Sequence, residues 1–67
     1  MQEKYDFVKI VDADDEFRSF VGQEGMVIEV DENYEYPYEV VFFNKEYQKI
    51  CIEHGGILWR ETDIDGI

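Results

Sequence analysis

The feature that most constrains this chain is that its apolar residues fall in short runs, separated by glycines or by acidic segments. Three of these runs are rich in β-branched and aromatic residues, which predicts strands rather than helices; they are residues 6–11, 26–30 and 38–43. In the first run, Val8 and Ile10 fall on one face of a strand and Phe7, Lys9 and Val11 on the other. We expect the side chains of Val8 and Ile10 to face the core.

The remaining elements are predicted from turn signals. Gly22 and Gly25 precede the second run and predict a tight turn with positive φ. Asn44-Lys45 is interpreted as a hairpin turn, which makes residues 46–52 the antiparallel partner of 38–43. Residues 60–63 predict a helical or 3₁₀ turn, and 64–67 a last short strand or tail.

The core has to be built from side chains alone. Sixty-seven residues allow one domain, spanning 1–67, and a domain of this size has marginal stability by default. With Cys51 as the single cysteine and His54 as the single histidine, neither an intramolecular disulfide nor a structural zinc site is expected. The predicted core is Val8, Ile10, Val27, Val40, Phe42, Ile50, Ile52 and Leu58.

The charge excludes several functions. Seventeen Asp and Glu against six Lys and Arg give a net charge of −11. That excess opposes binding to nucleic acid or to anionic lipid, because both require neutralising cations. With no apolar stretch long enough for a signal peptide or a membrane span, a cytoplasmic location is expected.

The order of the predicted elements resembles the SH3-like small barrels. The segment Val21–Val30, with its Gly-x-x-Gly-x-Val pattern, is similar to the core of KOW-type members, and Leu58–Ile64 is similar to the turn before their last strand. The resemblance runs from about Phe7 to Ile64. It implies an all-β, SH3-like barrel of about five strands with a short 3₁₀ turn before the last, as in many small bacterial, phage and prophage proteins. KOW-type domains often bind RNA or proteins of transcription and translation through basic and aromatic loops.

No catalytic centre is expected. Cys51 and His54 are three residues apart, but on a strand that spacing puts them on opposite faces, so Cys51 is interpreted as a core residue and His54 as a loop residue. The many carboxylates suggest acid–base chemistry only if a pocket raises the pKa of one of them, and the sequence predicts no such pocket. We therefore predict a protein that is not an enzyme and needs no cofactor or metal.

Two segments are candidates for a binding surface. The first is an acidic loop whose carboxylates are Asp12, Asp14, Asp15 and Glu16. It is interpreted as a solvated or protein-binding loop, with calcium as an alternative that is disfavoured because Phe17 stands where an EF-hand needs glycine. The second segment holds Tyr34, Tyr36, Pro37 and Tyr38. Period-two spacing puts the three rings on one side if the segment is extended, which favours a protein interface; alternatively, two of the rings belong to the core.

These observations favour a small, acidic, non-enzymatic protein-interaction module whose partner is another protein, and the negative charge would suit a basic surface on that partner. A second hypothesis is a nucleic-acid mimic that inhibits a basic nucleic-acid-binding protein, since clustered carboxylates attract and steer basic partners. Nucleic-acid binding in the KOW manner is a third hypothesis, which the acidic loops disfavour.

Overall fold

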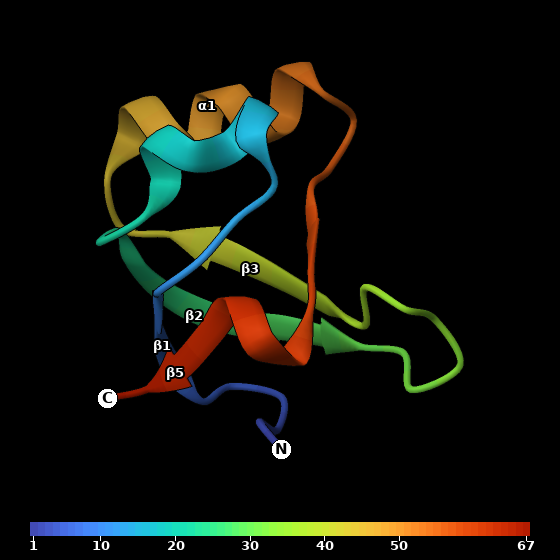
Figure 1. Cartoon of the computed structure of the whole chain (residues 1–67). Helices are drawn as coiled ribbons and strands as arrows, with labels where there is room; N and C mark the ends of the chain where they lie inside the picture. The colour runs from blue at the N-terminus through green and yellow to red at the C-terminus, as the bar shows by residue number, and fades with distance from the viewer.

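The computed structural model describes residues 1–67 and places five strands in one antiparallel sheet, with one α-helix and two 3₁₀ helices beside it. In chain order the elements are β1 (Phe7–Ile10), η1 (Asp15–Phe20), β2 (Glu24–Val30), β3 (Tyr38–Phe42), α1 (Lys45–Glu53), β4 (Leu58–Trp59), η2 (Glu61–Asp63) and β5 (Ile64–Gly66). The strand order is β4-β3-β2-β1-β5. The sheet curls into half of a barrel, and α1 and η1 lie over one end of it (Figure 1). None of the helices has the length and apolarity needed to cross a membrane.

The three strands predicted from the apolar runs are confirmed, and so is the 3₁₀ turn before the last strand. The alternation in β1 places Val8 and Ile10 in the core, as expected. In β2 the register with β3 shifts between Val27 and Glu29. Such an irregularity bends a strand and increases its twist, which is consistent with the curl of this sheet.

The predicted hairpin strand over 46–52 is wrong, because this segment is the helix α1. Asn44 is its N-cap rather than a turn residue, and the Asn44 side chain accepts a hydrogen bond from the backbone N–H of Glu46 at 2.9 Å. The helix ends in a Schellman motif: the N–H of Gly56 donates to the carbonyl of Cys51, and that of Gly55 to the carbonyl of Ile52. Both glycines have positive φ, which this motif requires of at least one residue.

The helix changes which side chains are buried. A period of 3.6 turns Tyr47, Ile50 and Cys51 toward the sheet and leaves Ile52 outside, 71% exposed. Cys51 is thus a core residue, as predicted, whereas the assignment of Ile52 to the core is wrong.

Leu58 is also wrongly assigned to the core. Instead of a hairpin partner, β3 pairs with the short strand β4, in which Trp59 lies opposite Tyr38. Because neighbours on a strand alternate between faces, burial of Trp59 turns Leu58 outward, where it is 45% exposed.

An aromatic cluster fills the space between the sheet, η1 and α1. Phe20 is 1% exposed, and its ring centroid lies 5.2 Å from Phe42, 4.9 Å from Tyr47 and 5.3 Å from Trp59. These edge-on and tilted arrangements are the favoured geometries for aromatic pairs. Phe20 therefore connects η1 to β3, α1 and β4.

The two glycines before the second run have different roles. Gly22 has a φ of +96°, so the predicted turn with positive φ is confirmed there. Gly25 instead lies within β2, where the backbone of β3 approaches closely. A Cβ atom on Gly25 would lie 2.2 Å from the carbonyl oxygen of Val41 and 2.7 Å from Cγ1 of Val40.

We predict that Gly25→Ala lowers the free energy of unfolding by about 1–3 kcal/mol, the usual cost of overpacking against atoms that cannot move aside. The matched control is Gly66→Ala in β5, where the added Cβ would meet only the flexible Gln2 side chain at 3.3 Å. That variant should stay within about 0.5 kcal/mol of the original chain. Urea unfolding measures both, and equal stability of the two variants would contradict the close approach of β2 and β3.

Candidate functional site

A cavity of about 370 Å³ opens between η1, the loop 31–37, β4 and η2, and we call it the groove. The residues that line it include Asp14, Glu16, Phe17, Tyr36, Leu58 and Trp59. The groove therefore combines aromatic and aliphatic surface with carboxylates, and its walls come from segments far apart in the sequence.

The aromatic side of the groove is fixed by ring packing. Phe17 lies edge-on to His54 with ring centroids 5.4 Å apart, and it is tilted against Trp59 at 6.3 Å. Trp59 is almost fully buried, and its Nε1 has no hydrogen-bond partner. Because the rings of Phe17 and Trp59 pack into the core cluster, this wall is preorganised.

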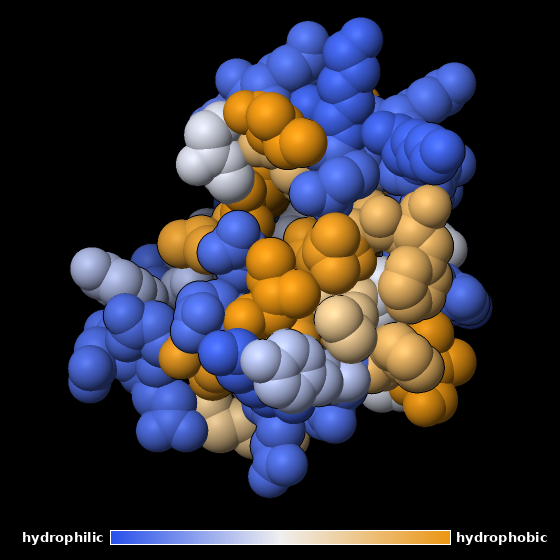
Figure 2. All heavy atoms as spheres, turned by 180° about the vertical axis from the view of Figure 1, so that it is seen from behind, coloured by the Kyte–Doolittle hydropathy of each residue, from blue (hydrophilic) through white to orange (hydrophobic).

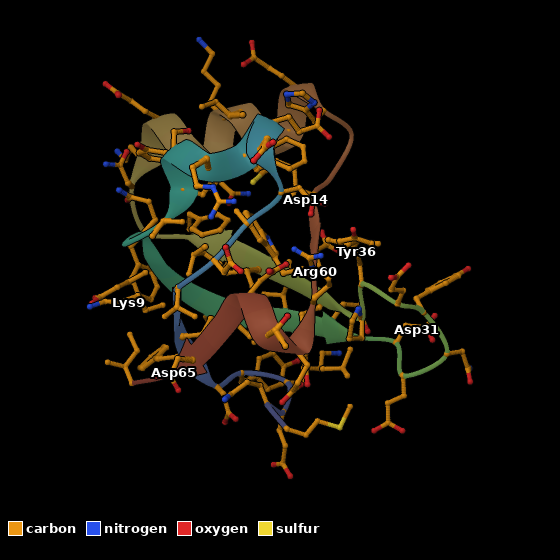
Figure 3. The ribbon with its side chains drawn as sticks, viewed as in Figure 1. Lys9, Asp14, Asp31, Tyr36, Arg60 and Asp65 are labelled. Atoms are coloured by element: carbon orange, nitrogen blue, oxygen red, sulfur yellow. The ribbon has the colours of Figure 1, made fainter.

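A second fixed point is Arg60, which follows Trp59. Its guanidinium contacts the carboxylates of Asp14 and Asp63 at 3.0 and 3.1 Å, and lies 5.3 Å from the centre of the Tyr36 ring. Figure 3 shows Asp14, Arg60 and Tyr36 close together, each from a different segment. Arg60 therefore joins the start of η1, the loop 31–37 and η2 at one edge of the groove.

Asp63 explains why Arg60 holds this position. The Asp63 carboxylate is almost fully buried and accepts hydrogen bonds from the backbone N–H of Arg60 at 3.0 Å and from its Nε at 3.2 Å. A buried carboxylate needs such partners, because an unpaired charge there is costly. The hydrogen bond to Asp63 is also the main reason why the pKa of Arg60 is raised.

The structure brings part of the acidic loop and part of the tyrosine cluster together. The hydroxyl of Tyr36 donates to Oδ2 of Asp14 at 2.9 Å, and this hydrogen bond raises the pKa of Tyr36. The side chain of Glu16 lines the groove and makes no ion pair or hydrogen bond within the chain. Asp14, Glu16 and Tyr36 are thus predicted site residues that lie in one place.

Asp12 and Asp15 lie elsewhere, because both pair with Arg18 in η1. Arg18 Nη1 is 2.6 Å from Oδ1 of Asp12, and Nη2 is 3.5 Å from Oδ1 of Asp15. A hydrogen bond from the backbone N–H of Ala13, followed by the one from Arg18, lowers the pKa of Asp12. These two carboxylates contact Arg18 at the surface and do not line the groove.

The tyrosine segment is not extended, so its rings do not share one side. Residues 32–36 form turns and bends, and Tyr38, the first residue of β3, is buried in the core. Tyr34 and Pro37 line a neighbouring hollow of about 180 Å³. That hollow shares Tyr36 and Leu58 with the groove, so the two depressions form one continuous surface.

Most residues that line the groove were not among the predicted site residues: Phe17, His54, Gly56, Ile57, Leu58, Trp59 and Asp63. The ion pair between Asp63 and Arg60 was not predicted either. A sequence signal exists for the last pair. Arg60 is one of two arginines in the chain, and it precedes a carboxylate by three residues in a predicted turn, a spacing that allows a bidentate pair.

Cys51 and His54 lie in different places, Cys51 in the core and His54 at the groove. Cys51 is buried between α1 and the sheet, and burial raises the pKa of its thiol. His54 is the C-cap of α1, and its exposed ring packs on Phe17 at the groove. No group of three or more His, Cys, Asp or Glu side chains has an arrangement that could hold a metal ion.

Comparison with protein-family models, with curated proteins and with solved structures gave no match. The function has to be inferred from the groove itself.

Tyr38 gives a pH-dependent stability that can be measured. Burial raises the pKa of its phenol to about 12, and the hydrogen bond that the hydroxyl donates to Glu61 acts in the same direction. In the unfolded chain a tyrosine ionises near pH 10. The contribution of neutral Tyr38 to stability should therefore be complete below about pH 10 and be lost as the pH rises from about 10 to about 12.

Urea unfolding across that interval measures this loss, and Tyr38→Phe is the control. Without the phenol, the variant should show a smaller fall in unfolding free energy between about pH 10 and about pH 12. Parallel curves for the two proteins would contradict a buried, hydrogen-bonded Tyr38.

Proposed function

We propose that this protein is an SH3-like small barrel that acts as a protein-interaction module and binds an extended, basic segment of a partner protein in the groove. The observation that carries the proposal is the continuous surface of Tyr34, Tyr36 and Leu58, bordered by two carboxylates, Glu16 and Glu39, that have no partner within the chain.

The topology supports the SH3-like assignment. Antiparallel strands in the order β4-β3-β2-β1-β5, with η2 between β4 and β5, agree with the order of elements in which the sequence resembles these barrels. The chain differs from that pattern in one connection, because α1 links β3 to β4 where the resemblance implies a hairpin. A fold of this kind supports many functions, so the groove has to supply the argument for binding.

The apolar part of the surface favours a peptide. Tyrosine offers a large contact area at a low cost in conformational entropy, and Leu58 lies between the groove and the neighbouring hollow. Two adjoining depressions of about 370 and 180 Å³ accept successive side chains of an extended segment better than they enclose one compact small molecule.

The charge favours a basic partner. Asp14 and Asp63 are already paired with Arg60, but Glu16 in the groove and Glu39 in the neighbouring hollow have no partner within the chain. Lysine or arginine side chains of a bound segment would pair with these carboxylates. The net charge of −11 adds long-range attraction, which increases the rate of encounter with a basic partner.

Selection from a random peptide library on the intact protein tests the proposal, with Trp59, the single tryptophan, as a fluorescent reporter in the groove. We predict that selected peptides are enriched in Lys and Arg next to apolar residues. Leu58→Ala and Glu16→Gln should each weaken their binding by about tenfold, since each removes one central contact. Ile52→Ala, an exposed position on α1, is the control and should bind normally.

The same peptides separate this proposal from nucleic-acid mimicry. Binding should weaken with salt in either case, but only groove binding should also depend on Leu58. Peptides that lack basic residues, or whose affinity is unchanged in both groove variants, would refute the proposed site.

A further inference from the structure

The outer face of the sheet carries an apolar row that the groove does not use. Phe7 in β1 lies opposite Met26 in β2, Met26 lies opposite Val41 in β3, and the N–H of Ile67 donates to the carbonyl of Phe7. These four side chains cross the sheet at one level, and Phe43 packs edge-on to Phe7 with ring centroids 5.8 Å apart. We call Phe7, Met26, Val41, Phe43 and Ile67 the outer row.

Three of the five residues of the outer row are exposed to an unusual degree, and Met26 and Val41 between them are half-buried. Phe7, Phe43 and Ile67 are 56%, 58% and 69% exposed. Figure 2, which views the molecule from behind, shows apolar side chains gathered over the sheet and charged side chains around them. A solvent-facing side of an antiparallel sheet is normally polar, and 34% of this chain is charged, so apolar residues here need a physical reason.

We propose that a second copy of this chain covers the outer row. Phe7, Phe43 and Ile67 supply most of the exposed area and the half-buried Met26 and Val41 add to it, so the row presents apolar area on the order of 400 Å² per copy. Two such rows face to face supply about 800 Å², and because the apolar share of an interface is about 60%, the whole contact is about 1,300 Å². That area lies at the lower end of specific protein–protein interfaces.

The charges next to the row are compatible with a two-fold contact. Lys9 lies opposite Glu24 on one side and Asp65 on the other, so this level of the outer face carries both signs. In a two-fold contact, Lys9 of one copy can face Glu24 or Asp65 of the other. Figure 3 shows Lys9 and Asp65 well apart from Asp14, Tyr36 and Arg60, so the groove stays free in the dimer.

The net charge gives this association an unusual salt dependence. Each copy carries −11, and this repulsion opposes association at low ionic strength. Salt screens the repulsion and also favours apolar burial, so the dimer should become stronger as salt is added. Binding of a basic segment in the groove should instead become weaker as salt is added.

Analytical ultracentrifugation of the intact chain tests the proposal, from about 10 μM to about 1 mM and at low and high salt. We expect a monomer–dimer equilibrium that shifts toward dimer when the salt is raised from about 0.05 M to about 0.5 M. Phe43→Lys should weaken the dimer by at least about tenfold. Phe7→Thr, which keeps a residue suited to a strand, should weaken it to a similar degree.

Ile52→Lys is the matched control, because it adds the same charge at an exposed apolar position on α1 and outside the row. It should leave the dimer unchanged, and circular dichroism checks that all variants are folded. A chain that remains monomeric at about 1 mM in high salt would overturn the proposal. So would a dimer that Ile52→Lys weakens as much as Phe43→Lys does. Peptide binding in the groove should be the same in Phe43→Lys, so the two proposals can fail independently.

Discussion

The packing of Phe20 against three other rings is the interaction on which the rest of this structure depends. A chain of 67 residues with a single cysteine has no covalent crosslink, and its sheet is curled but not closed. The Phe20 ring contacts Phe42, Tyr47 and Trp59, which belong to three different elements. Burial of these large side chains supplies much of the apolar area that a small domain needs, and it fixes η1 and α1 over the same end of the sheet.

The groove follows from that packing. Because Phe20 holds the end of η1, Phe17 three residues earlier forms a wall with Trp59, and Asp14 reaches Arg60. Arg60 in turn neutralises the buried Asp63 and fixes Tyr36. The carboxylates of Asp14 and Asp63 are thus paired with Arg60, while those of Glu16 and Glu39 stay available to a ligand. The site therefore has fewer unpaired carboxylates than the count of acidic residues in the sequence indicates, and these lie at two positions.

The sequence predicts those elements whose residue pattern is compatible with only one type of secondary structure. Residues 6–11 and 38–43 are rich in β-branched and aromatic residues, which favours strands, and the glycine at position 22 predicts a turn. Residues 46–52 were predicted wrongly because Ile50 and Ile52 alternate like a strand, although Asn44 before them and Gly55-Gly56 after them are helix-terminal signals. The groove was only partly predictable. Asp14 and Tyr36 meet through the fold of two distant loops, and Trp59 pairs with Tyr38 across two strands that α1 separates in the sequence.

The most direct test of this account is the set of nuclear Overhauser effects from the Phe20 ring in solution. The structure predicts strong nuclear Overhauser effects between the Phe20 ring and the rings of Phe42, Tyr47 and Trp59. It also predicts, along residues 45–53, the effects that are typical of an α-helix. Effects that preserve the pairing of β1, β2 and β3 but lack those between Phe20 and Trp59 would contradict it. In that case η1 would not lie over the sheet, and the groove would have no fixed wall.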